Sequence, residues 1–179
     1  MSDPPLFLAA DHDHRICARA ILAHAEGVCR TRGTRLTEQR RRVLEIVASS
    51  HAAIGAYAIM DRLKEGGGRP APIAVYRALD FLIANSLVHR IASRNAYVAC
   101  THLGPHHGSQ FLICRRCGTV GEMTSEGVWQ ALVGAAAGAG FSVVAPVIEV
   151  EGECAACDAA ATAAAAAPDG AAADTVAGA

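Results

Sequence analysis

Two cysteine pairs with the same spacing constrain this chain more than any other feature. Cys114 and Cys117 form one Cys-x-x-Cys, and Cys154 and Cys157 form a second. The two thiolates of such a pair can converge on a single ion, and Gly118 relieves the tight turn after the first pair. The two pairs together predict a closed, tetrahedral zinc site with four cysteine ligands. Thioredoxin-type redox pairs are the alternative, but no βαβ pattern surrounds either pair.

The charge of the chain is divided along its length. Residues 1–100 hold 14 Lys and Arg against 9 Asp and Glu, whereas residues 101–179 hold 2 against 8. A basic half joined to an acidic, metal-rich half indicates nucleic-acid binding by the first half. Seven cysteines give no even disulfide framework, and we find neither a signal-peptide pattern nor an apolar run long enough for a membrane span. We therefore expect a cytoplasmic protein with reduced thiols and no membrane partner.

Apolar periodicity predicts four helices in the basic half, over residues 15–30, 36–47, 56–64 and 73–85. The first has Ile16, Ala20 and Ala23 as its apolar stripe, and Cys17 and Cys29 in or beside it are expected to be small buried thiols. Thr37 is a good N-cap for the second helix. The apolar positions of the other three are Val43, Leu44, Val47, Ile59, Met60, Leu63, Val75, Leu79, Leu82 and Ile83.

The fourth helix has the features of a DNA-recognition helix. Tyr76, Arg77 and Asp80 lie opposite its apolar stripe and near its start, where such a helix presents side chains to bases and phosphates. An ordinary solvated face is the alternative interpretation. Six arginines crowd the start of the second helix, an arrangement suited to a phosphate backbone: Arg30, Arg32, Arg35, Arg40, Arg41 and Arg42.

Two short strand-like runs, residues 87–91 and 96–100, are joined by a turn and predict a β-hairpin. Short helices followed by a hairpin make a winged helix-turn-helix, and Arg94 at the wing tip could reach the DNA backbone or a minor groove. The acidic half predicts a strand ending at Cys114 and another over 119–122. A helix over 126–139 follows, with Val128, Leu132 and Val133 inward, and then a strand over 141–150. These elements form a small α/β unit that a zinc site would staple.

A second metal site is predicted from the ligands that remain. His89 and Cys100 lie in the wing strands, whereas Glu122 belongs to the α/β unit. One ion held by His89, Cys100, Glu122 and a later histidine would tie the two halves together and convert metal concentration into a relative orientation. Residue spacing favours no single histidine for the fourth position, which leaves His102, His106 and His107 open. Asp11 to His14 is a possible weak metal-binding tail or a solvated terminus.

Several motifs together resemble the Fur family of metal-responsive repressors, and within it the zinc-sensing branch, over about residues 20 to 157. The motifs are Arg35-Leu-Thr-x-Gln-Arg40, Val75-Tyr-Arg-Ala-Leu-Asp-Phe81, Val88-His89, Tyr97-Val-x-Cys100, His107-x-Ser-x-Phe-x-x-Cys-x-x-Cys117-Gly and Cys154-x-x-Cys157. The resemblance implies a homodimer that binds pseudo-palindromic, AT-rich operators when loaded with metal and represses uptake genes. It also implies DNA contacts by Tyr76 and Arg77.

The resemblance further implies two zinc ions per protomer. A structural zinc would use Cys114, Cys117, Cys154 and Cys157, and a regulatory zinc would use His89, Cys100, His107 and Glu122. The expected fold is α+β, with an N-terminal winged helix-turn-helix DNA-binding domain and a small C-terminal α/β dimerisation domain. The expected division is a disordered N-terminus (1–14), the DNA-binding domain (15–99), a linker with metal ligands (100–109), the dimerisation domain (110–157) and a disordered Ala/Gly-rich tail (158–179).

Three alternatives stay open. An iron- or peroxide-sensing member of the same family is the first, although the thiolate of Cys100 favours zinc over ferrous iron. A zinc hydrolase or deaminase is the second, but no His-x-Glu or His-Glu-x-x-His motif occurs, so we expect neither catalysis nor a small-molecule substrate. A zinc-ribbon interaction module without a DNA role is the third, and the basic first half with its wing argues against it.

Overall fold

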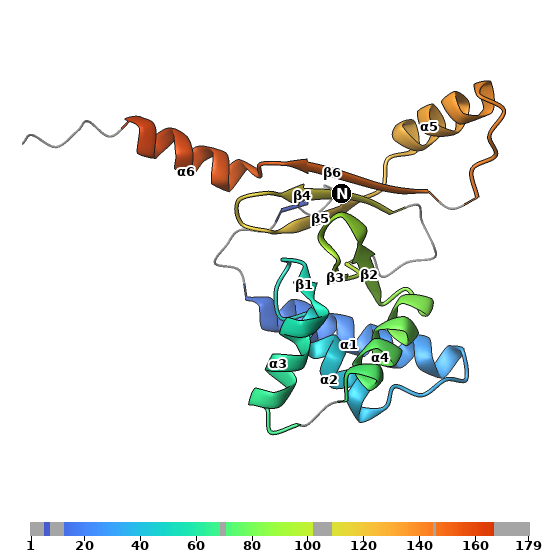
Figure 1. The fold of residues 1–179 in the computed structure, drawn as a ribbon, viewed down its shortest axis with the longest axis vertical. Helices are drawn as coiled ribbons and strands as arrows, with labels where there is room; N and C mark the ends of the chain where they lie inside the picture. The colour runs from blue at the N-terminus through green and yellow to red at the C-terminus, as the bar shows by residue number, and fades with distance from the viewer. Residues whose placement is uncertain (1–5, 8–12, 69–70, 102–108, 145, 167–179) are drawn as a thin grey trace, which may run out of the picture.

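The computed structural model describes residues 6–7, 13–68, 71–101, 109–144 and 146–166 of the 179-residue chain. Helices and one three-stranded sheet form an N-terminal unit, in the lower part of Figure 1. A second three-stranded sheet with two helices forms a C-terminal unit above it. The predicted α+β class is confirmed. None of the helices in these described ranges is both long and apolar enough to cross a membrane.

Four helices enclose the core of the N-terminal unit: α1 (His14–Thr31), α2 (Glu38–Val47), α3 (Ala56–Glu65) and α4 (Pro72–Ala84). The hydroxyl of Thr37 caps α2 by accepting a hydrogen bond from the backbone N–H of Arg40, as its sequence position predicts. Pro72 opens α4, where the missing N–H costs nothing. Nearly all predicted apolar positions of α2, α3 and α4 are buried in this core, and Ile83 is partly buried.

The predicted apolar stripe of α1 is wrong in phase. Ile16 is 59% exposed, whereas Ile21, Ala25 and Cys29 are buried. The run Ile21-Leu22 is also apolar. The helix therefore buries the face that carries Ile21 and Ala25 in the core cluster, with Leu22 packed against it. Of the two cysteines expected to be buried, Cys29 is buried and Cys17 is half-buried.

A small antiparallel sheet completes the N-terminal unit. Its strands β1 (Ile54–Gly55), β2 (Val88–Ile91) and β3 (Ala96–Ala99) are ordered β1-β3-β2. A short 3₁₀ turn, Ala92–Arg94, joins β2 to β3 and ends at Asn95 in the left-handed conformation. The hairpin of β2 and β3 is the predicted wing, and with α2, α3 and α4 it makes a winged helix.

The C-terminal unit is built around a central strand. β4 (Ser109–Cys114) pairs antiparallel with β5 (Val120–Met123) and parallel with β6 (Val147–Gly152). The parallel pairing requires a crossover, which contains α5 (Glu126–Gly138). A last helix, α6 (Ala155–Ala166), follows the second cysteine pair.

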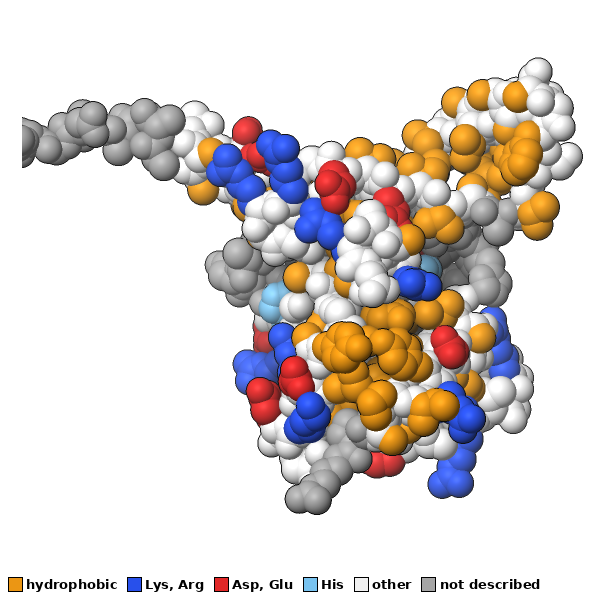
Figure 2. Space-filling model, in the orientation of Figure 1, with side chains coloured by type: hydrophobic (Ala, Val, Ile, Leu, Met, Phe, Trp, Pro, Cys, Tyr) orange, Lys and Arg blue, Asp and Glu red, His pale blue; other side chains and the backbone are white. Residues whose placement is uncertain are grey.

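Three expectations for the C-terminal unit need correction. The strand expected over 141–150 begins only at Val147. Val128, Leu132 and Val133 were expected to face inward, but no residue of α5 is buried, because the helix projects away from the sheet (Figures 1 and 2). The expected disorder from residue 158 is wrong as far as Ala166, since the alanine-rich segment forms α6. The remaining tail lies outside the described residues.

The N-terminus also departs from the expected disorder in its described part. Asp13 caps α1, and His14 is its first residue. Leu6 lies against β5, where a Cβ on Gly121 would come within 2.7 Å of the Leu6 Cγ, so a glycine is needed at this close approach. Residues 1–5 and 8–12, which include Asp11 of the possible metal-binding tail, lie outside the described residues.

The two units meet on one face of the C-terminal sheet. Ile91 and Val98 of the wing share an apolar cluster with three buried residues of the sheet: Phe111, Ile113 and Val120. Phe111 is directly opposite Glu122 on β5 and opposite Glu149 on β6. Because side chains opposite each other in a sheet lie on the same face, both carboxylates point toward the N-terminal unit.

Candidate metal centres and DNA-facing surface

The four cysteines predicted to bind zinc come together in the structure. The sulfur atoms of Cys114, Cys117, Cys154 and Cys157 all lie within 4.8 Å of one another. The Cys117 and Cys154 sulfurs are 3.8 Å apart, too far for a disulfide bond. A zinc ion with bonds of about 2.3 Å to four sulfurs in a tetrahedron gives S···S edges of about 3.8 Å. The four-cysteine cluster therefore has the dimensions of a structural zinc site.

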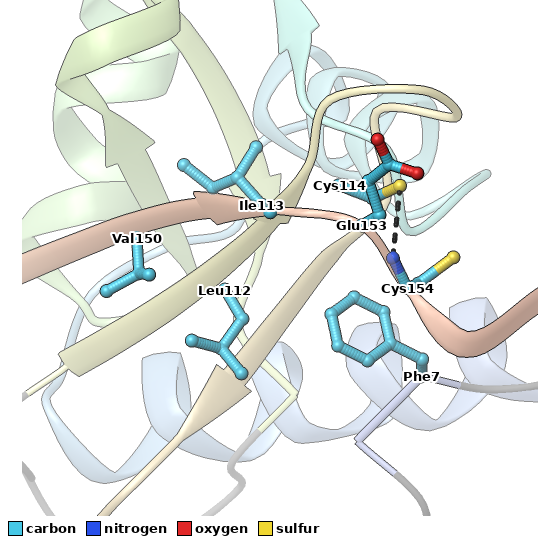
Figure 3. Close-up of a pocket in the computed structure, with 8 residues that line it drawn as sticks. Phe7, Leu112, Ile113, Cys114, Val150, Glu153 and Cys154 are labelled. Atoms are coloured by element: carbon cyan, nitrogen blue, oxygen red, sulfur yellow. Dashed lines mark hydrogen bonds between the residues drawn. The ribbon is translucent and has the colours of Figure 1, made fainter. Parts of the chain in front are cut away.

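Three elements position this cluster. Cys114 ends β4, and a tight turn with Gly118 in the left-handed region returns the chain to β5. The parallel register of β4 and β6 places Gly152 opposite Cys114, which brings Cys154 alongside. The backbone N–H of Cys154 donates to the Cys114 sulfur at 3.4 Å, the dashed line in Figure 3. Cys154 lies just before α6, and Cys157 follows three residues later in the first turn of that helix.

The electrostatics of the cluster favour a thiolate at Cys114. Hydrogen bonds from the backbone of Cys117 and then of Cys154 lower the pKa of Cys114 to about 6. The hydrogen bond with Cys154 and the charge of Cys114 are among the causes that raise the pKa of Cys157 to about 12. Several thiolates in one small volume repel one another, and a divalent cation removes that repulsion.

A second group of metal-ligand types spans the two units. His89 on β2, Cys100 just after β3 and Glu122 on β5 have ligand atoms within 4.8 Å of one another, and we call them the inter-unit site. The His89 Nε2 lies 2.9 Å from the Glu122 Oε1, and the Cys100 sulfur lies 3.9 Å from the same oxygen. Cys100 and Glu122 are buried. One nitrogen, one sulfur and one carboxylate oxygen thus face a common point.

The side chain of His89 argues that this point is a cation site. Its Nε2 is buried and forms no hydrogen bond within the described residues, even though Glu122 is close. A buried imidazole nitrogen with no donor or acceptor in bonding geometry is costly unless something else satisfies it. A borderline divalent metal accepts this mixture of donors, so the residues present fit zinc.

Neighbouring side chains hold the inter-unit site in place. The backbone N–H and the hydroxyl of Thr101 both donate to the Glu122 Oε2, at 3.0 and 3.3 Å. This leaves the Oε1 facing His89 and Cys100. The ring of Phe111 packs beside the imidazole of His89, with centroids 5.2 Å apart. The sequence pattern did not identify Thr101, because its role depends on a contact between residues 21 positions apart.

The fourth predicted ligand cannot be placed. His107 and the two alternatives, His102 and His106, lie outside the described residues. The choice among the three histidines stays a prediction. So does the zinc-binding role of the three ligands that are brought together.

The predicted DNA contacts lie in different surroundings. On α4, Tyr76 is 40% exposed and Arg77 is exposed, so both are available to a partner. Arg35 is exposed, but Arg40 donates to the Arg35 carbonyl at 2.6 Å and its guanidinium stacks on the ring of Phe81. Arg40 therefore fixes the start of α2 against α4.

Two further residues, Arg94 on the wing and Tyr57 on α3, bear on the predicted DNA contacts. The wing-tip Arg94 forms an ion pair with Glu151 of β6 at 2.9 Å. Tyr57, in the first turn of α3, is 77% exposed and was not among the predicted site residues. The signal available in the sequence was a tyrosine two positions before Ile59, the first residue of the apolar stripe of α3.

A winged helix joined to a metal-binding α/β unit, with ligand groups at the junction, defines a metal-dependent DNA-binding protein. The match to known families agrees with this class. The chain belongs to the ferric uptake regulator family, whose model matches residues 31–151.

Several of the similar proteins are named as regulators of zinc uptake. The chain is 45% identical to the zinc uptake regulation protein of Escherichia coli (strain K12) over 139 residues, which are 76% of this chain and 81% of the relative. It is similar to a solved zinc uptake regulator in complex with zinc and DNA, with 42% identity, a TM-score of 0.75, and coverage of 81% of this chain and 97% of that chain. It is also similar to holo XcZur, with 40% identity, a TM-score of 0.70, and coverage of 78% of this chain and 98% of that chain.

Proposed function

We propose that this protein is a zinc-responsive transcriptional repressor. It acts as a homodimer in the cytoplasm and binds AT-rich, pseudo-palindromic operators of zinc-uptake genes when zinc fills the inter-unit site. The observation that carries the proposal is the placement of that site: two ligands come from the wing and one from the C-terminal sheet. The similarity to regulators of zinc uptake, one of them solved with zinc and DNA, supports the same conclusion.

Two zinc ions per protomer are proposed, with different roles. The four-cysteine cluster would hold a structural ion, since four thiolates leave no open coordination position. The inter-unit site would hold the regulatory ion through His89, Cys100 and Glu122, with His107 as the fourth ligand. The thiolate of Cys100 disfavours ferrous iron, which prefers nitrogen and oxygen donors.

The regulatory ion would act by fixing one orientation of the wing. A ligand shifts an equilibrium between two conformations only by its difference in affinity for them, and about 5.5 kcal/mol converts a 1:99 population into 99:1. Zinc binding to protein sites reaches about 10 kcal/mol or more, so an ion shared between the units has enough free energy. Without it, the described residues of the wing and the sheet would be held together by the apolar cluster and by the polar contacts of the wing tip.

The operator would contact the α4 face of the N-terminal unit. Tyr76 and Arg77 would face the bases, and Arg35 the phosphate backbone. Arg40 would act mainly by orienting Arg35 and α4.

Dimerisation would use the C-terminal unit. Val128 and Leu132 of α5 are 42% and 38% exposed in the single chain, and Phe141 and Val147 are 66% and 62% exposed. Hydrophobic side chains gather over α5 in the upper right of Figure 2. An apolar helix without a buried face is typical of a surface that another subunit covers. A second copy of the chain supplies a matching surface in a twofold dimer.

The test is fluorescence anisotropy of a zinc-importer promoter fragment against buffered free zinc, with ferrous iron and manganese in parallel. We expect binding that rises steeply at very low free zinc and does not respond to the other metals. Activation by iron or manganese would reassign the sensor while keeping the family. Binding that ignores every metal would contradict the proposal.

A further inference from the structure

The tip of the wing is held by two acidic side chains from the C-terminal sheet. The Glu149 Oε1 accepts a hydrogen bond from the Ala92 N–H at 2.7 Å, and its Oε2 accepts one from the Ser93 N–H at 2.9 Å. The Nε of Arg94 donates to the Glu151 carboxylate at 2.9 Å. We call this set of contacts the wing clamp. All three wing residues are consecutive, so the clamp holds the whole turn.

The contacts of Glu149 are of a strong type. A carboxylate that accepts from two backbone N–H groups makes two charge-assisted hydrogen bonds with fixed geometry. Partial burial raises the pKa of Glu149, but hydrogen bonds from the Ser93 hydroxyl and from the Ser93 and Ala92 backbones outweigh this, and the pKa lies below its ordinary value. The ionised form is therefore the one that the wing stabilises.

The wing clamp and the inter-unit site are two ends of one attachment. Glu122 and Glu149 flank Phe111 in the same row across the sheet. Glu122 faces the base of the wing, where β2 carries His89 and β3 ends before Cys100. Glu149 reaches the tip of the same hairpin. One point of attachment allows a hairpin to pivot, whereas two points on a rigid sheet fix its angle.

We propose that Glu149, assisted by Glu151 and Arg94, is a positioning residue for zinc-dependent DNA binding: it anchors the wing tip so that zinc bound at the wing base sets one wing orientation. This inference rests on the proposed function and adds a residue to its mechanism. Without the anchor, zinc still binds at the base of the wing, but the tip can move. The coupling free energy between zinc binding and DNA binding is then smaller.

The test compares Glu149→Gln with the unaltered protein in full-length, zinc-loaded form. Glutamine keeps the size of the side chain but has one acceptor oxygen, and its NH₂ group opposes one of the two backbone donors. The first readout is hydrogen exchange of the Ala92 and Ser93 amides without DNA. The second is the ratio of the operator Kd without regulatory zinc to the Kd with it. The third is the zinc content per protomer.

We expect exchange of both amides to accelerate at least tenfold and the zinc-dependent ratio of Kd values to fall at least fivefold, with the zinc content unchanged. Glu153→Gln is the matched control, because Glu153 pairs with Arg115 and Arg116 inside the C-terminal unit. The control should leave the exchange and the ratio as they are in the unaltered protein.

Two results would overturn the inference. Faster exchange with an unchanged ratio would make Glu149 a purely structural contact. A rise in DNA affinity without zinc would mean that the clamp holds the wing away from DNA. Failure of the proposed function is separable, because it appears as zinc-independent DNA binding by the unaltered protein, whereas the amide exchange reports on the clamp without DNA.

Discussion

The two ligand groups of this protein differ in where their members come from. The four-cysteine cluster takes its ligands from the end of β4, the turn after it and the chain that follows β6, all inside the C-terminal unit. The inter-unit site takes His89 and Cys100 from the wing and Glu122 from the other unit. The first uses a single kind of soft donor, whereas the second mixes nitrogen, sulfur and oxygen.

Under the proposed function, this difference would let the same metal stabilise the fold at one site and regulate DNA binding at the other. An ion within one unit stabilises that unit whatever the other unit does. An ion between units is bound well only when the units have one relative orientation, so its binding free energy is coupled to that orientation. Substitutions in the two groups should therefore fail in different ways.

The largest effect is expected from Cys114→Ser. The loss of one thiolate from the closed cluster removes most of a binding free energy on the order of 10 kcal/mol, which is also folding free energy of the C-terminal unit. Circular dichroism melts and zinc analysis should show an unfolded C-terminal unit without its structural zinc. Cys17→Ser is the control, since Cys17 belongs to neither group. A folded dimer of unaltered thermal stability would contradict the structural role.

His89→Ala should separate regulation from stability. We expect a folded dimer with its four-cysteine cluster intact, whose DNA binding needs at least about 100-fold more free zinc, beyond the 10- to 100-fold typical of losing an outer contact. The anisotropy titration measures the shift. His24→Ala on α1 is the matched control for loss of an imidazole. An unshifted zinc titration would remove His89 from the regulatory site.

Arg77→Ala tests a surface that contacts neither ligand group. If the guanidinium reads a base, operator affinity at saturating zinc should fall by roughly 1–3 kcal/mol, while the zinc midpoint stays in place once the weaker binding is allowed for. Titration with an operator and with a scrambled duplex measures both quantities. Equal affinity of variant and unaltered protein would exclude a base contact.

The smallest effects are expected from a pair of threonines. Thr101→Val removes the hydroxyl bond to Glu122 at the inter-unit site, and zinc affinity there should fall about tenfold. Thr119→Val removes the hydroxyl 3.2 Å from the Cys117 sulfur, but all four thiolates of the cluster remain and zinc retention should change little. Competition with a chelator of known affinity measures both. Equal losses of zinc affinity would mean that both ligand groups depend to the same extent on hydrogen bonds from neighbouring hydroxyls.

Much of the fold could be predicted because its signals are local. The Thr37 cap and the apolar spacing of α2, α3 and α4 depend on residues within a few positions of each other. The four-cysteine cluster could be predicted from two short spacings. The buried face of α1 could not be predicted in the same way. More than one face of this helix is partly apolar, and the face that is buried is the one that joins the core cluster.

Other parts of the site depend on contacts that no local pattern contains. Thr101 contacts Glu122, and Glu149 contacts the wing, only through the sheet register. The parallel pairing of β4 with β6, which places Glu149 in the same row as Glu122, has no signature in either strand. The unburied α5 could not be predicted either, since its periodicity indicates an apolar face but not which chain covers it.

The parallel pairing of β4 and β6 also has a consequence for the order of folding. Strand β5 can pair with β4 soon after both leave the ribosome, because a short turn joins them. Cys114 meets Gly152 only after a loop of nearly 40 residues has closed, and such distant pairings form slowly. We therefore expect Cys114 and Cys117 to come together early in folding, before Cys154 and Cys157 join them. An ion bound by Cys114 and Cys117 would have only two of its four ligands until β6 pairs with β4. The rate at which the other two ligands bind would therefore measure the rate at which the crossover between β5 and β6 folds.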